Sequence, residues 1–273
     1  MPEDQLLSWG WRVPFWLSVV VVAIGYFIRR TLAETPAFLE EKQQHAAPKL
    51  PLAVLFSDYT TDVARVVLCA LVSTVSTIFG VYALSYAVNT VKIDRSTMLW
   101  VAILTNFAAL AAIPLFAMLS DLIGRKPVYI FGAVVPAALM FPYLWSISEA
   151  SIPLIFMFGI LMSGVAYSAS NGIWPSFYGE MFSTRVRLSG MAIGTQIGFA
   201  IGGFAPVLAA ALEGEGPIGW VPVALLTAAI CVVASIAAWT ARETYNIPMN
   251  DLGTKTAATG ARSSSGSGPL RVG

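Results

Sequence analysis

The stretch 150–179 is free of charge, yet several polar and aromatic side chains recur along it at steps of three and four residues. In a helix this spacing gathers them on one stripe. Hydrocarbon would penalise such a stripe, whereas a water-filled cavity would accept it. We therefore expect it to line a solute path, with hydrogen bonding between helices as the alternative. Its members are Ser163, Tyr167, Ser170, Asn171, Trp174 and Tyr178.

A second, weaker polar stripe lies on the apolar stretch 66–91, at Ser73 and Thr77. These side chains would line the same solute path. Arg65 lies just before this stretch, with Asp62 upstream. Its long side chain could extend to the membrane surface, as basic side chains near span ends do, or it could meet an anionic solute.

The residues that build an enzyme or a metal centre are scarce in this sequence. The one histidine, His45, lies in a polar loop, and Cys69 and Cys231 each lie inside an apolar run. A nucleophile with its base, or a metal cluster, needs more than this. We therefore expect no enzyme activity, no metal and no cofactor. The charge-free stretches also hold no carboxylate or histidine, although proton-coupled transport needs a titratable group in the membrane.

The composition indicates a protein whose surface meets lipid. Of 273 residues, 57% are hydrophobic and only 11% are charged, and the mean hydropathy is +0.73. Soluble domains carry about 25% charged residues, so this chain has too few to cover a water-facing surface. The net charge of +1 provides no basic surface for nucleic acid. The lipid bilayer is the expected partner.

Seven charge-free stretches are candidates for membrane-spanning helices, since a bilayer core needs about 20 apolar residues in a helix. We predict an all-α membrane protein with an outer terminus and first span (1–29), a cytoplasmic loop (30–62), a six-helix bundle (63–241) and a disordered cytoplasmic tail (242–273). The stretches are 13–28, 66–91, 96–120, 127–148, 150–179, 188–212 and 216–241.

Basic residues mark the cytoplasmic flanks of membrane spans. Of the 16 Lys and Arg, only Arg12, Lys92 and Arg95 flank the opposite side. We therefore expect a multi-pass protein of the cell membrane, with its amino terminus outside and its carboxyl terminus in the cytoplasm. An amino terminus that crosses the membrane without a basic leader suggests that earlier spans are missing.

The cytoplasmic loop at 117–126 reads Ala-Met-Leu-Ser-Asp-Leu-Ile-Gly-Arg-Lys. It resembles the Gly-x-x-x-Asp-x-x-Gly-Arg-Lys loop of the major facilitator superfamily, with Ala117 in place of the first glycine. The resemblance implies that Asp121, Gly124, Arg125 and Lys126 brace the two halves of a transporter when its cytoplasmic side closes. The alternative is that the basic pair only fixes the topology.

The loop at 174–187 looks like a second loop of the same superfamily, Pro-x-x-x-x-Glu-x-Phe-x-x-x-x-Arg. The same two interpretations, gating and topology, apply to Glu180, Arg185 and Arg187. The stretches 8–15 and 30–38 are similar to the start and end of helix six in the metabolite:proton symporter family, which includes permeases for shikimate, citrate and proline or betaine. The resemblance covers about residues 8–245.

This resemblance implies helix six plus the carboxy-terminal six-helix bundle of a secondary transporter. The implied activity is proton symport of a small polar metabolite, with an organic acid favoured, and the implied partners are protons and the amino-terminal half. The missing proton-coupling acid should then lie in that half. A seven-helix binding or sensor protein is the alternative.

One further pattern concerns packing. Small residues at four-residue spacing let helix backbones approach closely. We expect such a packing ridge, rather than a binding site, at Gly190, Gly194, Gly198 and Gly202.

Overall fold

The computed structural model describes residue 5, residues 8–31 and 51–245, and residues 247 and 252. The expected structures at 32–50, which include His45, and in most of the tail at 242–273 lie outside the described residues. The described residues are mostly helical and contain no strand. The chain divides into two units, Met1–Ala46 and Ala47–Gly273.

The first unit contains η1 (Gly10–Arg12) and α2 (Val13–Thr31). Together they form an apolar span of 22 residues, Gly10–Thr31. The described side chains of α2 from Phe15 onward are exposed all round the helix. A helix that is apolar on every side needs hydrocarbon or another protein surface around it.

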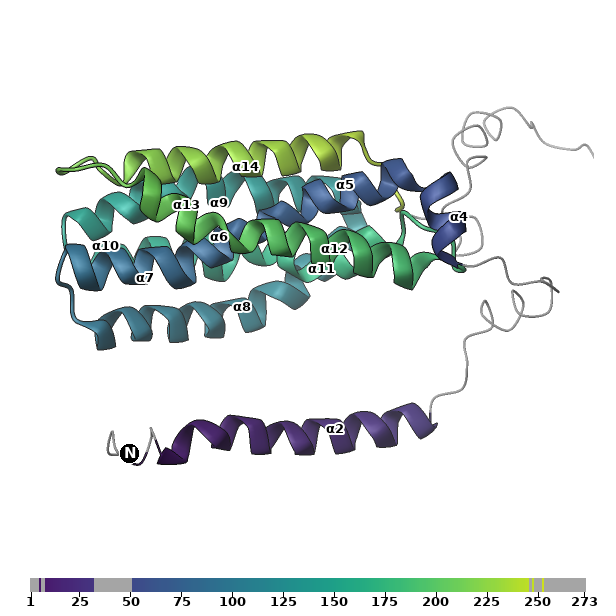
Figure 1. Cartoon of the computed structure of the whole chain (residues 1–273), viewed down its shortest axis with the longest axis horizontal. Helices are drawn as coiled ribbons and strands as arrows, with labels where there is room; N and C mark the ends of the chain where they lie inside the picture. The colour runs from purple at the N-terminus through teal and green to yellow at the C-terminus, as the bar shows by residue number, and fades with distance from the viewer. Residues whose placement is uncertain (1–4, 6–7, 32–50, 246, 248–251, 253–273) are drawn as a thin grey trace, which may run out of the picture. The chain divides into compact units, whose positions relative to one another are not determined.

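The second unit begins with α4 (Pro51–Asp58) and continues with six further helices that are long and apolar enough to cross a bilayer. With the span of the first unit they confirm the predicted seven-span, all-α membrane fold (Figure 1). Three of these six spans are single helices: Arg95–Ile123 (α8), Arg125–Ser148 (α9) and Val221–Thr240 (α14). The other three consist of consecutive helical segments: Thr60–Thr90 (α5 Thr60–Ala70, η2 Leu71–Ser73, α6 Thr74–Thr77, η3 Ile78–Tyr82, α7 Ala83–Ser85, η4 Tyr86–Thr90), Ile152–Gly179 (α10 Ile152–Gly159, η5 Ile160–Ala166, α11 Tyr167–Gly179) and Arg187–Leu212 (α12 Arg187–Gly203, α13 Ala205–Leu212).

The ends of the spans differ from the charge-free stretches where charge or a turn intervenes. The second span starts at Thr60 rather than 66, because Asp62 and Arg65 form its first turns. The last span starts at Val221 rather than 216. A turn precedes it, closed by the bond from Gly214 N to Gly219 O (2.9 Å). The boundaries of a charge-free stretch therefore predict a helix end less accurately than capping and turn residues do.

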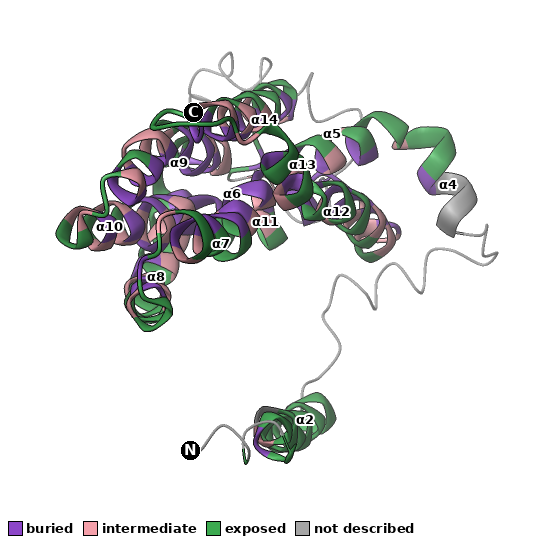
Figure 2. Cartoon of the chain, turned by 60° about the vertical axis from the view of Figure 1, so that its left-hand side comes forward, coloured by how far each residue is buried: buried purple, intermediate pink, exposed green. Residues whose placement is uncertain are grey.

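The six spans of the second unit pack around two apolar cores. In the bundle α9 packs against α11 and α14, and α5 packs against α12 and α14 (Figure 1). We call the end of the bundle at Gly124, where α8 meets α9, the motif end. The core nearer this end contains Cys69, Tyr129 and Phe177, and the core nearer the opposite end contains Tyr143 and Cys231. Buried residues face these cores and exposed ones cover the outside (Figure 2).

The glycines at four-residue spacing are all buried on α12. A Cβ at Gly194 would lie 2.6 Å from Val66 Cγ1, and one at Gly198 would lie 2.5 Å from Ala70 Cβ. These distances are too short for any side chain. The glycines therefore allow α12 to approach the backbone of α5 closely.

Three segments of the bundle are π-helical: η3 (Ile78–Tyr82), η4 (Tyr86–Thr90) and η5 (Ile160–Ala166). Such wider turns are rare and are frequent at functional sites. They interrupt the two spans that carry the predicted polar stripes, and so they change which side chains share a face.

Candidate functional site

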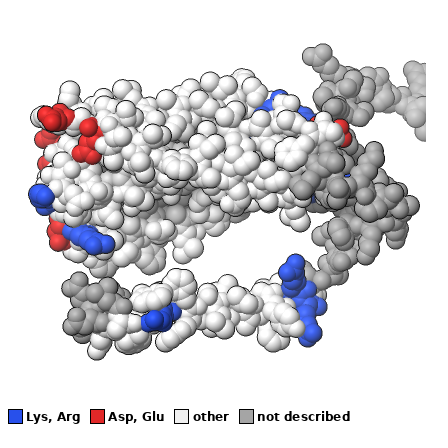
Figure 3. Space-filling model, in the orientation of Figure 1, with Lys and Arg blue, Asp and Glu red and all other residues white. Residues whose placement is uncertain are grey.

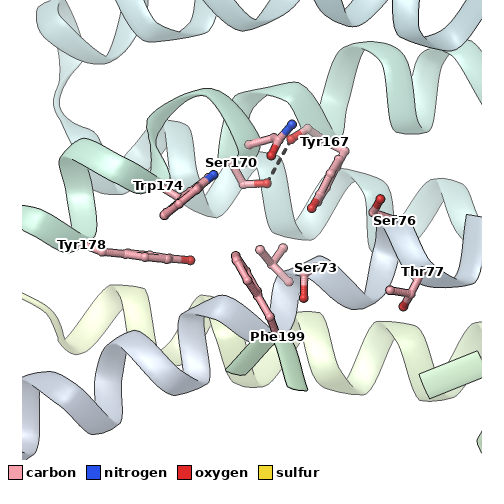
Figure 4. A pocket seen from close by; sticks show the side chains of 10 residues that line it. Ser73, Ser76, Thr77, Tyr167, Ser170, Trp174, Tyr178 and Phe199 are labelled. Carbon is pink, nitrogen blue, oxygen red and sulfur yellow. Dashed lines mark hydrogen bonds between the residues drawn. The ribbon is translucent and has the colours of Figure 1, made fainter. Parts of the chain in front are cut away.

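A cavity of about 230 Å³ opens between the span Thr60–Thr90, α11 and α12 (Figure 4). It brings together seven of the side chains predicted for the solute path, which come from two spans distant in sequence. Within the described part of the chain, no charged residue lines it. The lining residues are Val72, Ser73, Ser76, Thr77, Tyr167, Ser170, Asn171, Trp174, Tyr178 and Phe199.

The polar groups of the cavity differ in how fully they are bonded. Ser170 Oγ lies 3.0 Å from the carbonyl oxygen of Tyr167 and 3.1 Å from that of Gly132, so its one proton is shared between acceptors on α11 and α9. Thr77 Oγ1 lies 3.0 Å from Thr74 O and 3.3 Å from Gly202 O. Ser73 Oγ is buried without a hydrogen bond. A buried hydroxyl without a partner calls for a ligand or a water.

Aromatic rings form much of the cavity wall. Trp174 lies 5.9 Å from Tyr178 and 5.8 Å from Phe199, measured between ring centroids. Behind this wall, Tyr129 donates to the carbonyl of Cys69 (2.6 Å), and its hydroxyl lies 2.9 Å from that of Tyr178. Since Tyr129 gives its proton to Cys69 O, Tyr178 donates to Tyr129. This chain holds the ring of Tyr178 in place.

Two residues expected on the solute path do not line the cavity. Ser163 lies in η5, and a π-helical turn shifts residues off the stripe that α-helical spacing predicts. Arg65 lies near the motif end and pairs with the buried Asp62 at 2.8 Å. Asp62 also accepts from Arg242 at 3.1 Å. The three-residue spacing of Asp62 and Arg65 on α5 fits this pair, whereas Arg242 is distant in sequence and spacing could not reveal it as a second partner of Asp62.

The motif residues meet in a network of charges at the motif end. Arg125 pairs with Asp121 of α8 and with Glu180, where Nη2 lies 3.3 Å from Oε1. Lys126 Nζ donates to the carbonyl of Trp239 at the end of α14 (2.6 Å). Arg185 is half-buried in the connection between α11 and α12. The loops after α8, α11 and α14 are thus joined within the second unit.

Glu243 is a central member of this network that the sequence did not reveal. Its carboxylate accepts from the backbone N–H groups of Arg125 (3.0 Å) and Lys126 (3.1 Å), at the amino end of α9. Gly124 precedes them with φ +104°, and a Cβ there would lie 3.0 Å from Glu243 Oε2. Thr244 donates to Glu180. The carboxylate thus caps the positive end of α9.

Comparison with known proteins places this sequence in a family. The family model of the Major Facilitator Superfamily matches residues 66–264. The chain belongs to the Major Facilitator Superfamily, as its loops predicted. Members are transporters rather than enzymes, and the chain is a multi-pass membrane protein.

Its relatives support the narrower metabolite:proton symporter family. The chain is 29% identical to the shikimate transporter of Escherichia coli over 86% of this chain and 55% of the relative. It is 30% identical to the proline/betaine transporter of Salmonella typhimurium (90% and 51%) and 27% identical to the citrate-proton symporter of Klebsiella pneumoniae (78% and 48%). The chain thus spans about half the length of these relatives. No solved structure matches it.

Proposed function

We propose that this chain forms one half of a secondary transporter that moves a small polar metabolite, an organic acid in particular, across the cell membrane by proton symport. The observation that carries the proposal is the cavity, because hydroxyl, amide and aromatic groups converge there inside a membrane fold. Ligand sites of this kind combine apolar walls with a few placed polar groups. Ser73, whose hydroxyl has no hydrogen bond in the described part of the chain, is one of the residues that line the cavity.

The proposal requires a second half. Substrate sites of secondary transporters lie at the interface between structural repeats, and this chain spans about half of its relatives. We infer that the bundle at 63–241 supplies one wall, and that an amino-terminal half supplies the other. The charged network would brace the two halves when the motif end closes, and that end would face the cytoplasm.

The described part of this wall offers no proton acceptor that titrates near neutral pH. No Asp, Glu or His lines the cavity. A symporter needs a titratable group in the membrane. We therefore place the coupling acid in the other half, which leaves this half the task of holding the uncharged part of the solute.

The test is uptake of labelled shikimate by cells that make this chain together with the amino-terminal half of the Escherichia coli shikimate transporter. Uptake should need both chains and should fall when a proton uncoupler collapses the gradient. Asn171→Ala should lower uptake about tenfold through lost polar contacts. Ser235→Ala on α14 removes a hydroxyl outside the cavity and should leave uptake unchanged.

Three results would count against the proposal. Uptake that survives the uncoupler would contradict proton symport. Binding of shikimate without uptake, in cells where both chains reach the membrane, would favour the sensor alternative. Equal loss from Asn171→Ala and Ser235→Ala would contradict the cavity as the solute site.

A further inference from the structure

A second cavity, of about 290 Å³, lies on the same span toward the end of the bundle opposite the motif end. We propose that it is a docking site for the carboxylate of the solute, occupied before the solute reaches the central cavity. The proposal rests on the transport function proposed above. Its lining residues are Gly80, Val81, Leu84, Ser85, Val88, Asn89 and Arg95.

Among the residues that the structure describes, Arg95 supplies the only charge of this outer cavity. The side chain is exposed, and within the described part of the chain its guanidinium has no ion pair or hydrogen bond. The neighbouring Asp94 is not paired with it in the described part of the chain, and its carboxylate instead accepts from the Ser96 hydroxyl and from Thr97 N (3.1 Å). A free guanidinium matches a carboxylate in shape and charge and can bind both of its oxygens.

The remaining polar groups are arranged beside the guanidinium. Asn89 Nδ2 donates to Ser85 Oγ at 3.0 Å, which fixes the amide and leaves its second N–H free to donate. Val81, Leu84 and Val88 supply apolar surface. The cavity therefore fits a small molecule with a carboxylate at one end and a carbon skeleton behind it. It contains no acidic side chain that would bind a cation.

The two cavities lie along one face of one helix. The central cavity is lined by Val72, Ser73, Ser76 and Thr77, and the outer one continues the same four-residue rhythm from Gly80 to Asn89. In an ideal α-helix, four-residue steps drift by about 40° each, so such a row would wind around the helix. The wider turns of η3 and η4 reduce this drift. The π-helical segments thus keep one continuous lining from the outer cavity to the central one.

Site-directed thiol labelling tests this site in the chain as it exists, because Cys69 and Cys231 are both buried and should not react in the folded state. Three matched variants each replace a serine with cysteine: Ser85→Cys in the outer cavity, Ser76→Cys in the central cavity and Ser148→Cys at the end of α9. Each is labelled in phosphatidylcholine nanodiscs with an anionic and with a cationic methanethiosulfonate reagent.

At Ser85→Cys the positive charge of Arg95 should increase the labelling rate of the anionic reagent. The ratio of anionic to cationic labelling rates should fall about tenfold when Arg95→Gln is added, as expected for the loss of a guiding charge. Arg95→Lys should keep most of the ratio. At Ser148→Cys the ratio of anionic to cationic labelling rates should change little when Arg95→Gln or Arg95→Lys is added. An unchanged ratio at Ser85→Cys would overturn the proposal.

Shikimate then serves as the carboxylate probe, with its uncharged methyl ester as the control. Shikimate should slow labelling at Ser85→Cys, the ester should not, and Arg95→Gln should abolish the protection. Protection at Ser76→Cys but not at Ser85→Cys would reject the outer site and leave the transport path intact. Protection at Ser85→Cys alone would support the outer site and count against the central one.

The headgroup of an anionic lipid carries a negative charge that Arg95 could bind in place of the solute carboxylate. The lipid composition is therefore varied in a separate experiment. Nanodiscs that contain phosphatidylglycerol should label Ser85→Cys at nearly the rate seen in phosphatidylcholine. If the anionic lipid slows labelling and shikimate does not, the cavity binds a lipid headgroup and the proposal is wrong.

Discussion

Individual residues at the motif end determine whether its loops stay joined. The glycine of the Gly-Arg-Lys sequence lies where the chain turns from α8 into α9, and its positive φ brings the backbone against the Glu243 carboxylate. The carboxylate in turn holds the first N–H groups of α9. The motif glycine is therefore needed for a contact within this bundle.

Gly124→Ala should destabilise the chain by about 1–3 kcal/mol, because an alanine at φ +104° is strained and its Cβ meets the Glu243 side chain. The midpoint of thermal unfolding in detergent measures the loss. In a Glu243→Ala background, which removes the side chain that the Cβ meets, the cost of Gly124→Ala should be smaller by the part due to that contact. Stability equal to the natural chain would show that the turn tolerates a side chain.

Glu243→Gln should cost about 1 kcal/mol, since an amide keeps one acceptor but loses the charge that favours the positive end of α9. Glu215→Gln, at the opposite end of the bundle, is the matched control, because Glu215 makes no bond in the described part of the chain. Thermal midpoints compare the two variants. Equal midpoints would contradict the capping role of Glu243.

Among whole elements, the long apolar helices were predictable and the path of their polar faces was only partly so. Charge-free stretches located all seven spans, because hydrocarbon excludes charge from a helix wherever it occurs. Tyr167, Ser170, Asn171 and Trp174 reach one cavity because α11 is regular over that length. Ser163 does not line that cavity, since η5 interposes a wider turn that hydropathy does not register.

The partners of charged residues were harder to predict than the spans. Glu243 and Arg125 are far apart in sequence, and only the folded bundle places the end of α14 beside the start of α9. The same holds for Asp62 and Arg242. Sequence spacing reports neighbours on one helix, whereas these pairs join different helices. The outer cavity was missed for a related reason, because Arg95 was interpreted only as a marker of topology.

Close packing of α12 on α5 gives a prediction for the element as a whole. Gly198→Ala should destabilise the bundle by about 1–3 kcal/mol, since its Cβ would lie 2.5 Å from Ala70 Cβ and 2.6 Å from Val67 O. Gly203→Ala, at the end of the same helix, meets nothing within 4 Å. The control should match or exceed the natural stability, because alanine favours helix over glycine.

Thermal midpoints of the two alanine variants provide the measurement. If both variants unfold at the same temperature, the glycine spacing does not reflect close approach of the two helices.

Considered as a whole, the bundle has charged ends and an apolar middle (Figure 3). Several spans contribute buried residues to both cores. In α9, Tyr129 lies in the core at the motif end and Tyr143 in the opposite one, and α14 likewise carries Cys231 and Ala234 in different cores. Since neither core can lose its packing without disturbing α9 and α14, we expect the bundle to unfold as one cooperative unit.

The two native cysteines test this directly, because Cys69 belongs to the core at the motif end and Cys231 to the opposite one. In Cys231→Ala a fluorogenic maleimide reports only on Cys69, and in Cys69→Ala only on Cys231. For each variant, the midpoint of thiol exposure is compared with the midpoint of the loss of helical circular dichroism in that same variant. This comparison corrects for the effect of the substitution on stability. Thiol exposure and helix loss should coincide in both variants, as two-state unfolding requires. Exposure of Cys69 well before helix loss, with Cys231 still protected, would mean that the motif end opens separately, an opening that a gate at that end would need.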